Sequence, residues 1–173
     1  RRRSLIERVA LAATRDGRTP PPLRQASKRD VADERETQSP VRARILLAED
    51  NPINAKIATA MLSAEGHTVR WTEDGEAALA ALHEETFDII LLDMRMPKLD
   101  GRATARAIRA MGGAYATMPI LALTAEAFVE DAANAMAAGV SEVLSKPVDR
   151  QVLAATVARW VTRARQKAAL QSQ

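Results

Sequence analysis

From residue 41 onward, short apolar runs alternate with segments whose apolar residues recur at helical spacing. Buried strands of a parallel sheet read as near-continuous apolar runs, and five such runs predict strands at 44–48, 67–71, 87–92, 119–123 and 142–145. Helices are expected after each strand, at 52–64, 74–84, 100–110 and 126–138, with the last beginning at Asp149. Five repeats of strand then helix predict an α/β fold with a doubly wound parallel sheet.

The last helix is expected to turn one apolar face toward this sheet. The residues of that inner face are Val152, Leu153, Thr156, Val157 and Trp160.

Polar residues stand at the carboxyl ends of four of the predicted strands. Glu49 and Asp50 follow the first strand and Asp93 follows the third, while Thr124 and Lys146 follow the fourth and fifth. In the flavodoxin-like strand order 2-1-3-4-5, with helices on both faces, strands one and three are neighbours, so the three carboxylates meet at one edge. Crowded carboxylates need a proton or a cation, and Mg²⁺ prefers carboxylate oxygens. The ammonium and hydroxyl groups suit phosphoryl oxygens, so the pattern predicts a site for a divalent cation and a phosphoryl group at an aspartate nucleophile.

Four short motifs carry a resemblance to a known family. They are Ala48-Glu49-Asp50-Asn51, the run from Asp93-Met94-Arg95-Met96-Pro97 to Asp100-Gly101, Leu123-Thr124-Ala125, and Ser145-Lys146-Pro147. In this order and at these strand ends, they resemble the receiver domains of two-component response regulators over about residues 41–165. The opening Ala-Glu-Asp-Asn-Pro-Ile-Asn is similar to receivers at the C-terminal end of hybrid sensor histidine kinases.

The resemblance implies a role for each site residue. Asp93 would accept a phosphoryl group from a phosphohistidine, and Thr124 and Lys146 would respond to the phosphorylated state. Mg²⁺ would be held by Asp50, Asp93 and the backbone carbonyl of Arg95, and Glu49 would complete the metal site mainly through water. A cis peptide bond is expected before Pro147. Such a domain catalyses its own phosphorylation and dephosphorylation, while the parent protein would be a histidine kinase.

The expected partners are a histidine kinase core or a histidine phosphotransfer protein. They would dock on the first helix, whose apolar residues are Pro52, Ile53, Ala55, Ile57 and Ala58. The resemblance also places Arg95 and Glu126 beside the phosphoryl group.

One position departs from the family pattern and keeps alternatives open. Val143 stands three places before Lys146, where the family's switch has an aromatic residue, so the output mechanism is undefined. A receiver-like module that regulates a kinase by docking or by binding a small ligand is therefore the main alternative. A magnesium-dependent phosphatase ranks last, because it needs an acid where this chain has Arg95.

Composition and charge divide the chain into four parts. Residues 1–18 are expected to form a helix, either a generic one or the end of an upstream receiver-like domain, since 2–9 resembles 149–156. Residues 19–40, with three consecutive prolines, predict a flexible linker; 41–165 form the domain and 166–173 a tail. Ten Lys/Arg against six Asp/Glu give residues 1–40 a net charge of +4. This basic segment is interpreted as solvated linker rather than a nucleic-acid site, because it has no interleaved aromatic residues.

The remaining composition excludes several classes of function. There is no Cys, which excludes disulfides and thiolate chemistry. No apolar run reaches the roughly 20 residues of a membrane span, so a cytoplasmic location without membrane contact is expected. Because few residues follow the fifth helix, no DNA-binding domain is expected on this chain.

Overall fold

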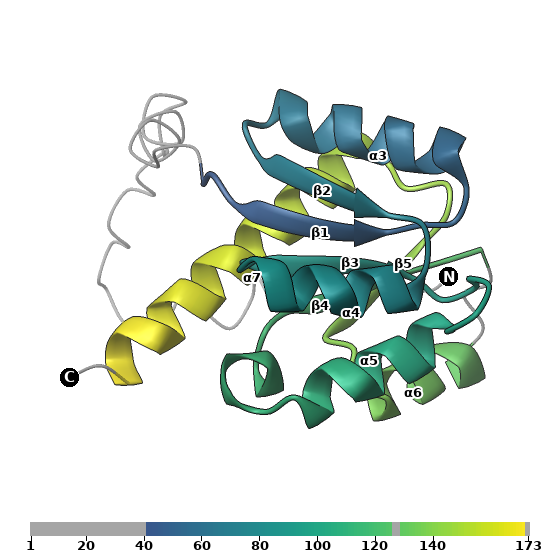
Figure 1. Ribbon diagram of the computed structural model, residues 1–173. Helices are drawn as coiled ribbons and strands as arrows, with labels where there is room; N and C mark the ends of the chain where they lie inside the picture. Colours follow the sequence, from purple (N-terminus) through teal and green to yellow (C-terminus); the bar gives the residue numbers. More distant parts are fainter. Residues whose placement is uncertain (1–40, 126–128, 172–173) are drawn as a thin grey trace, which may run out of the picture. The chain divides into compact units, whose positions relative to one another are not determined.

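The computed structural model describes residues 41–125 and 129–171, which contain a five-stranded parallel sheet of order β2-β1-β3-β4-β5 (Figure 1). The strands are β1 (Arg44–Ala48), β2 (Thr68–Thr72), β3 (Ile89–Asp93), β4 (Ile120–Thr124) and β5 (Glu142–Ser145). The predicted flavodoxin-like order is confirmed. The predicted segments 1–18 and 19–40, and the start of the helix predicted at 126–138, lie outside the described residues.

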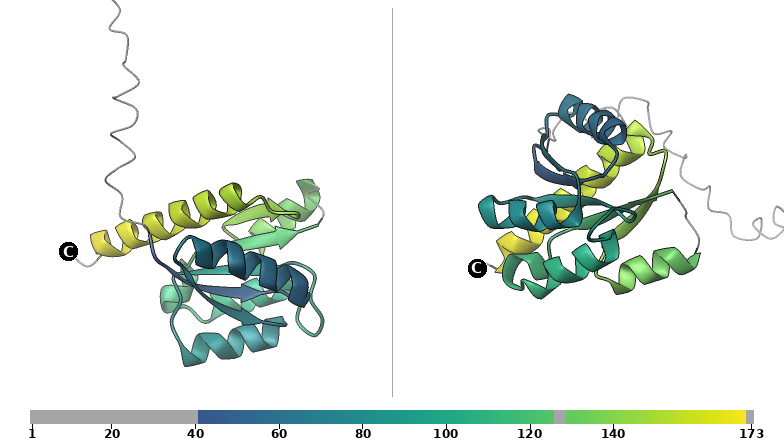
Figure 2. Two further views of the ribbon diagram at one scale, coloured as in Figure 1. Left: turned by 90° about the horizontal axis from the view of Figure 1, so that it is seen from above. Right: turned by 45° about the vertical axis from the view of Figure 1, so that its right-hand side comes forward.

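Helices cover both faces of the sheet (Figures 1 and 2). They are α3 (Pro52–Ala64), α4 (Gly75–Glu84), α5 (Gly101–Ala110), a short 3₁₀ turn η1 (Gly113–Ala116), α6 (Val129–Ala137) and α7 (Arg150–Gln171). Figure 2 shows α3 and α7 side by side on one face, while α4, α5 and α6 cover the other. This two-layered cover explains why the inner strands β1, β3 and β4 are apolar on both sides.

Alternate residues of each strand enter two separate cores. On β1, Ile45 and Leu47 pack with the residues of α3 and α7, whereas Leu46 and Ala48 pack with α4 and its neighbours. Every residue of β3 and β4 is buried. The centre of the sheet is therefore packed on both faces, and its carboxyl edge presents the polar residues.

Three strands, β2, β3 and β4, differ from the prediction at both ends: each begins one or two residues later, and ends one residue later, than predicted. The predicted strands 87–92 and 119–123 stop one residue early, because Asp93 pairs with Leu123 and Thr124 pairs with Ser145 in the ladder. Strand β2 likewise ends at Thr72 rather than at Trp71. Backbone pairing continues past the last apolar side chain, so Asp93 and Thr124 are strand residues and are held by the sheet itself.

The last helix departs from its predicted inner face at one residue. Val152 is exposed, while Leu153, Val157 and Val161 lie fully or almost fully buried. These three recur every four residues along the face of α7 that meets the sheet, and Val152 lies one residue off that row. The helix continues to Gln171, past residue 165, where the sequence places the end of the domain.

Side-chain caps fix where the helices that follow β1 and β2 begin. Asn51 accepts from the backbone N–H groups of Ile53 and Asn54 at the start of α3. The predicted cap Asp74 accepts from the Ala77 N–H, 2.8 Å away, and also pairs with Lys98. Donation from Ala77 and then from Lys98 lowers the pKa of Asp74 below its ordinary value.

We expect Asp74→Ala to lower the free energy of unfolding by about 1 kcal/mol, the usual effect of losing a helix N-cap. A carboxyl group with a lowered folded-state pKa stabilises above its unfolded pKa of about 3.9, and this contribution is lost as pH falls through the folded-state pKa. Urea denaturation at pH 7 and at pH values below 4 measures the difference from the unmodified chain, which should shrink in acid. Asp74→Asn is the control, since it keeps the cap acceptor; equal losses in both variants would contradict the capping role.

Candidate functional site

The carboxyl edge of the sheet brings the predicted acidic residues together. Glu49 and Asp50 follow β1, Asp93 ends the adjacent strand β3, and ligand oxygens of the three carboxylates all lie within 4.8 Å of one another. Glu49 and Asp93 are only 2% and 6% exposed, whereas Asp50 is open to solvent. The cluster therefore has a buried floor and one accessible carboxylate.

Lys146 lies between two of these carboxylates. Its Nζ is 2.6 Å from Glu49 Oε2 and 2.7 Å from Asp93 Oδ2. Burial lowers the pKa of Lys146, but its hydrogen bonds to both carboxylates and their charges outweigh this and raise the pKa above its ordinary value. The lysine is thus a fixed positive charge at neutral pH, directly beside Asp93.

The charges of the cluster fit a divalent cation. Three carboxylates and one ammonium leave an excess of two negative charges (−3 + 1 = −2). The donor set consists of oxygen atoms, which hard cations such as Mg²⁺ and Ca²⁺ prefer. The residues present therefore suit a bound divalent cation, with Asp50 as the accessible ligand.

The turn after β3 folds back on Asp93. The backbone N–H of Arg95 donates to Asp93 Oδ1 at 3.1 Å, so one carboxylate oxygen faces this turn and the other faces Lys146. Ligation by the Arg95 carbonyl stays a prediction, and Glu126 lies outside the described residues.

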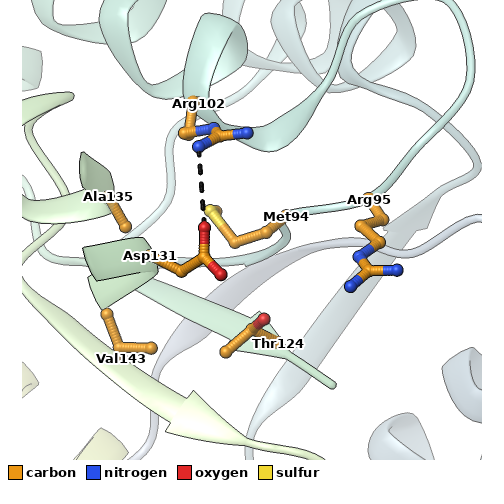
Figure 3. Close-up of a pocket in the computed structure, with 7 residues that line it drawn as sticks. All are labelled: Met94, Arg95, Arg102, Thr124, Asp131, Ala135 and Val143. Carbon is orange, nitrogen blue, oxygen red and sulfur yellow. Dashed lines mark ion pairs between the residues drawn. The ribbon is translucent and has the colours of Figure 1, made fainter. Parts of the chain in front are cut away.

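Thr124 lines a small pocket beside the cluster. The pocket holds about 190 Å³ and is bordered by Met94, Arg95, Arg102, Thr124, Asp131, Ala135 and Val143 (Figure 3). An ion pair of 3.9 Å between Arg102 of α5 and Asp131 of α6 closes one side. Val143, on β5, lines the same pocket as Thr124, so the position where the family's switch has an aromatic residue borders this pocket.

The loop after β5 is fixed to the end of β4. The Lys146 N–H donates to the Thr124 carbonyl at 2.7 Å, and the Lys146–Pro147 peptide bond is cis, which confirms the predicted isomer. This connection places Thr124 and Lys146 at adjoining strand ends.

Two residues that the sequence did not single out contact Glu49. Asn54 Nδ2 donates to Glu49 Oε1 at 3.0 Å, and Trp71 Nε1 donates to the Glu49 carbonyl at 2.8 Å. Asn54 could have been noticed, because it lies in the first turn of the helix that follows the acidic pair. Nothing in the local pattern around Trp71 indicates its contact, which depends on the pairing of β1 with β2.

Comparison with known families settles the classification of the chain. A model of the response regulator receiver domain matches residues 45–158. The chain belongs to this family. The expected resemblance is therefore confirmed, and the acidic cluster occupies the carboxyl edge of a receiver domain.

The curated relatives of this receiver domain include sensor kinases. Over 79% of the chain it is 33% identical to the sensor protein GacS of Pseudomonas syringae, and over 70% it is 35% identical to the sensor histidine kinase RcsC of Salmonella typhimurium. The match spans only 15% and 12% of the length of these two proteins. The similarity therefore describes one domain of such kinases.

Solved structures agree with this fold. The signal receiver domain of a histidine kinase from Syntrophus aciditrophicus is 28% identical, with a TM-score of 0.65 over 69% of this chain and 90% of that one. The chemotaxis response regulator CheY4 of Vibrio cholerae is 31% identical, with a TM-score of 0.65 over 69% of this chain and 99% of that one. Within residues 41–125 and 129–171, no helix is long and apolar enough to cross a bilayer.

Proposed function

We propose that this receiver domain accepts a phosphoryl group on Asp93 from a phosphohistidine, in a Mg²⁺-dependent reaction, as one step of a phosphorelay in a hybrid histidine kinase. The observation that carries the proposal is the environment of the Asp93 carboxylate. It lies within 4.8 Å of two further carboxylates, and Lys146 donates to one of its oxygens at 2.7 Å. A structural aspartate at a strand end needs neither feature.

Each residue has a defined part in the transfer. An Asp93 carboxylate oxygen attacks phosphorus and forms a P–O bond, while the P–N bond to the donor imidazole breaks and its electron pair stays on the leaving nitrogen. Lys146 and the Thr124 hydroxyl stabilise the negative charge on the phosphoryl oxygens. Mg²⁺ held by Glu49, Asp50 and Asp93 would supply further charge neutralisation there.

The surface next to the site supports a helical partner. Ile53 and Ile57 of α3 are 68% and 50% exposed, whereas Ala55, on the opposite side of the helix, is buried against the sheet. A groove of about 490 Å³ runs beside Ile57, is lined largely by apolar side chains, and reaches Glu49 and Lys146. A histidine-bearing helix seated on this apolar surface would bring its imidazole to the phosphoacceptor, so we propose a kinase core or a histidine phosphotransfer domain as the partner.

One observation favours a second candidate. Val143 cannot act as an aromatic switch, and the pocket beside Thr124 stands open. A module that keeps the receiver fold but regulates a kinase by docking, without phosphorylation, would need neither the switch nor a reactive Asp93.

Intact mass after incubation with Mg²⁺ and a small acyl phosphate separates the two candidates. We expect a gain of one phosphoryl group that disappears in Asp93→Asn and when Mg²⁺ is chelated. Asp100→Asn is the matched control, because it makes the same chemical change at an exposed aspartate and keeps an oxygen that can accept the helix cap from Ala103. A folded chain that gains no phosphoryl group, or that keeps the gain in Asp93→Asn, would refute phosphorylation at Asp93.

A further inference from the structure

The peptide that joins Glu49 to Asp50 is held from the side by strand β2. Glu49 lies one residue beyond the end of β1, where the β1–β2 ladder closes with Ala48 opposite Thr72. The Glu49 N–H still donates to the Thr72 carbonyl, at 3.1 Å. Beyond Thr72 the chain turns toward Asp74, the cap of α4, and leaves the sheet. The Glu49 carbonyl is therefore bonded by the Trp71 indole N–H, at 2.8 Å, which extends the ladder with a side chain.

The contacts of the Glu49 side chain complete the restraint. Asn54 donates to Oε1 at 3.0 Å and Lys146 donates to Oε2 at 2.6 Å. With the backbone bonds, the N–H, the carbonyl and both carboxylate oxygens of Glu49 each have a partner. Because Glu49 and Asp50 share one peptide unit, fixing the orientation of its carbonyl also fixes the Asp50 N–Cα bond, and so the position of the Cα that carries the Asp50 side chain.

Burial alone does not account for a tryptophan at position 71. Trp71 is 44% exposed on an edge strand of the sheet, although its polar atom is engaged at the acidic cluster. A buried tryptophan usually finds a partner for its N–H, whereas a half-exposed one can leave that bond to water. Here the bond goes instead to a backbone atom between two candidate metal ligands.

We propose that Trp71 is a positioning residue for the cation site: its indole N–H orients the Glu49–Asp50 peptide and thereby sets the Mg²⁺ affinity without contacting the ion. The inference rests on the proposed function, since it concerns the same cation site. Groups that orient metal ligands from outside typically change metal affinity about 10–100-fold when removed. A role in folding alone would change stability and leave the affinity of the folded protein unaltered.

Calorimetric titration with Mg²⁺ tests the proposal. We expect Trp71→Phe to weaken Mg²⁺ binding by about tenfold. Trp160→Phe is the matched control, because Trp160 is also partly buried and its Nε1 also makes one hydrogen bond, to Glu142 Oε2 at 2.6 Å, away from the cluster. It should leave the affinity unchanged. Unaltered affinity in Trp71→Phe, or an equal loss in both variants, would overturn the role of Trp71.

A second replacement distinguishes the contribution of the indole N–H from that of the ring, and it avoids the loss of packing that phenylalanine would cause. In the Trp160→Phe background, Trp71 is replaced by 3-benzothienylalanine, which keeps the fused ring but has sulfur in place of the N–H. The same loss of affinity is expected, and an affinity equal to the background would overturn the proposal. If the unmodified chain neither binds Mg²⁺ nor accepts a phosphoryl group, the proposed function itself fails; if it does both and the Trp71 replacements bind Mg²⁺ equally well, only the positioning role fails.

Discussion

Replacing Lys146 with methionine is expected to move two properties of the site in opposite directions: Mg²⁺ binds more tightly, while phosphorylation of Asp93 slows about a hundredfold or more. The ammonium lies 2.6 Å from Glu49 and 2.7 Å from Asp93, so it competes with a cation for the same carboxylates. Removing it deepens the negative potential that attracts Mg²⁺. In the proposed transfer the same ammonium would be the positive charge beside the phosphoryl oxygens, and methionine cannot replace it there.

The stability of this variant should depend on the metal. Without Mg²⁺, Glu49 and Asp93 would be left buried with no cation, and breaking such a buried pair typically costs about 3–5 kcal/mol. Added Mg²⁺ binds only the folded chain at this site, so it should restore much of the loss by mass action. Urea denaturation with and without Mg²⁺ measures both effects.

Lys98→Met is the control for the loss of one lysine. Lys98 pairs with Asp74 and is largely exposed, so this variant should keep the Mg²⁺ affinity and the phosphorylation rate of the unmodified chain. Calorimetry and the time course of the mass gain compare the two variants. Weaker Mg²⁺ binding in Lys146→Met would show that the lysine orders the carboxylates rather than competing with a cation, contrary to this account.

The centre of the sheet was predictable because strands β3 and β4 are buried on both faces. In β3 and β4 all side chains but the last are apolar, and no other local structure explains such runs between helical segments. The acidic cluster followed from the same logic, since the order of a doubly wound sheet fixes which strand ends are neighbours. The positions of Asp93 and Thr124 were therefore correct although the ends of their strands were not.

Contacts that depend on register and packing were not predictable. The bond from Trp71 to Glu49 requires that Trp71 pair with Leu47, and no local pattern reports the pairing of two strands. The place of Asn54 in the first turn of α3 brings it near the acidic pair, but which atom of Glu49 it contacts depends on how the helix packs. The prediction that Val152 lies on the inner face of α7 was wrong for a similar reason. A helical face several residues wide can rotate slightly about the helix axis, and packing against the sheet decides which edge of that face is exposed.

Gly101, the first residue of α5, packs against the backbone at the end of β3, next to Asp93. We expect Gly101→Ala to lower both the free energy of unfolding and the rate of phosphorylation. A Cβ at Gly101 would lie 2.3 Å from the Asp93 carbonyl oxygen and 2.7 Å from Met94 Cα, both backbone atoms that cannot rotate away. Overpacking of this kind typically costs about 1–3 kcal/mol. In a helix interior alanine is favoured over glycine by about 1 kcal/mol, so helix propensity alone predicts at most a small gain and the close approach predicts a loss.

The slower phosphorylation is expected because the added Cβ forces one of two segments of the backbone to move. Either α5 withdraws from the sheet or the backbone at the end of β3 shifts, and that backbone carries Asp93, the proposed phosphoacceptor. A misplacement of about 1 Å at a reacting group can lower a rate about a hundredfold. Urea denaturation and the time course of the mass gain measure the two losses. Arg106→Ala, on the exposed side of α5, is the control and should change neither. A Gly101→Ala chain as stable and as reactive as the unmodified one would show that the β3–α5 junction yields, and that the glycine is not what holds Asp93 in place.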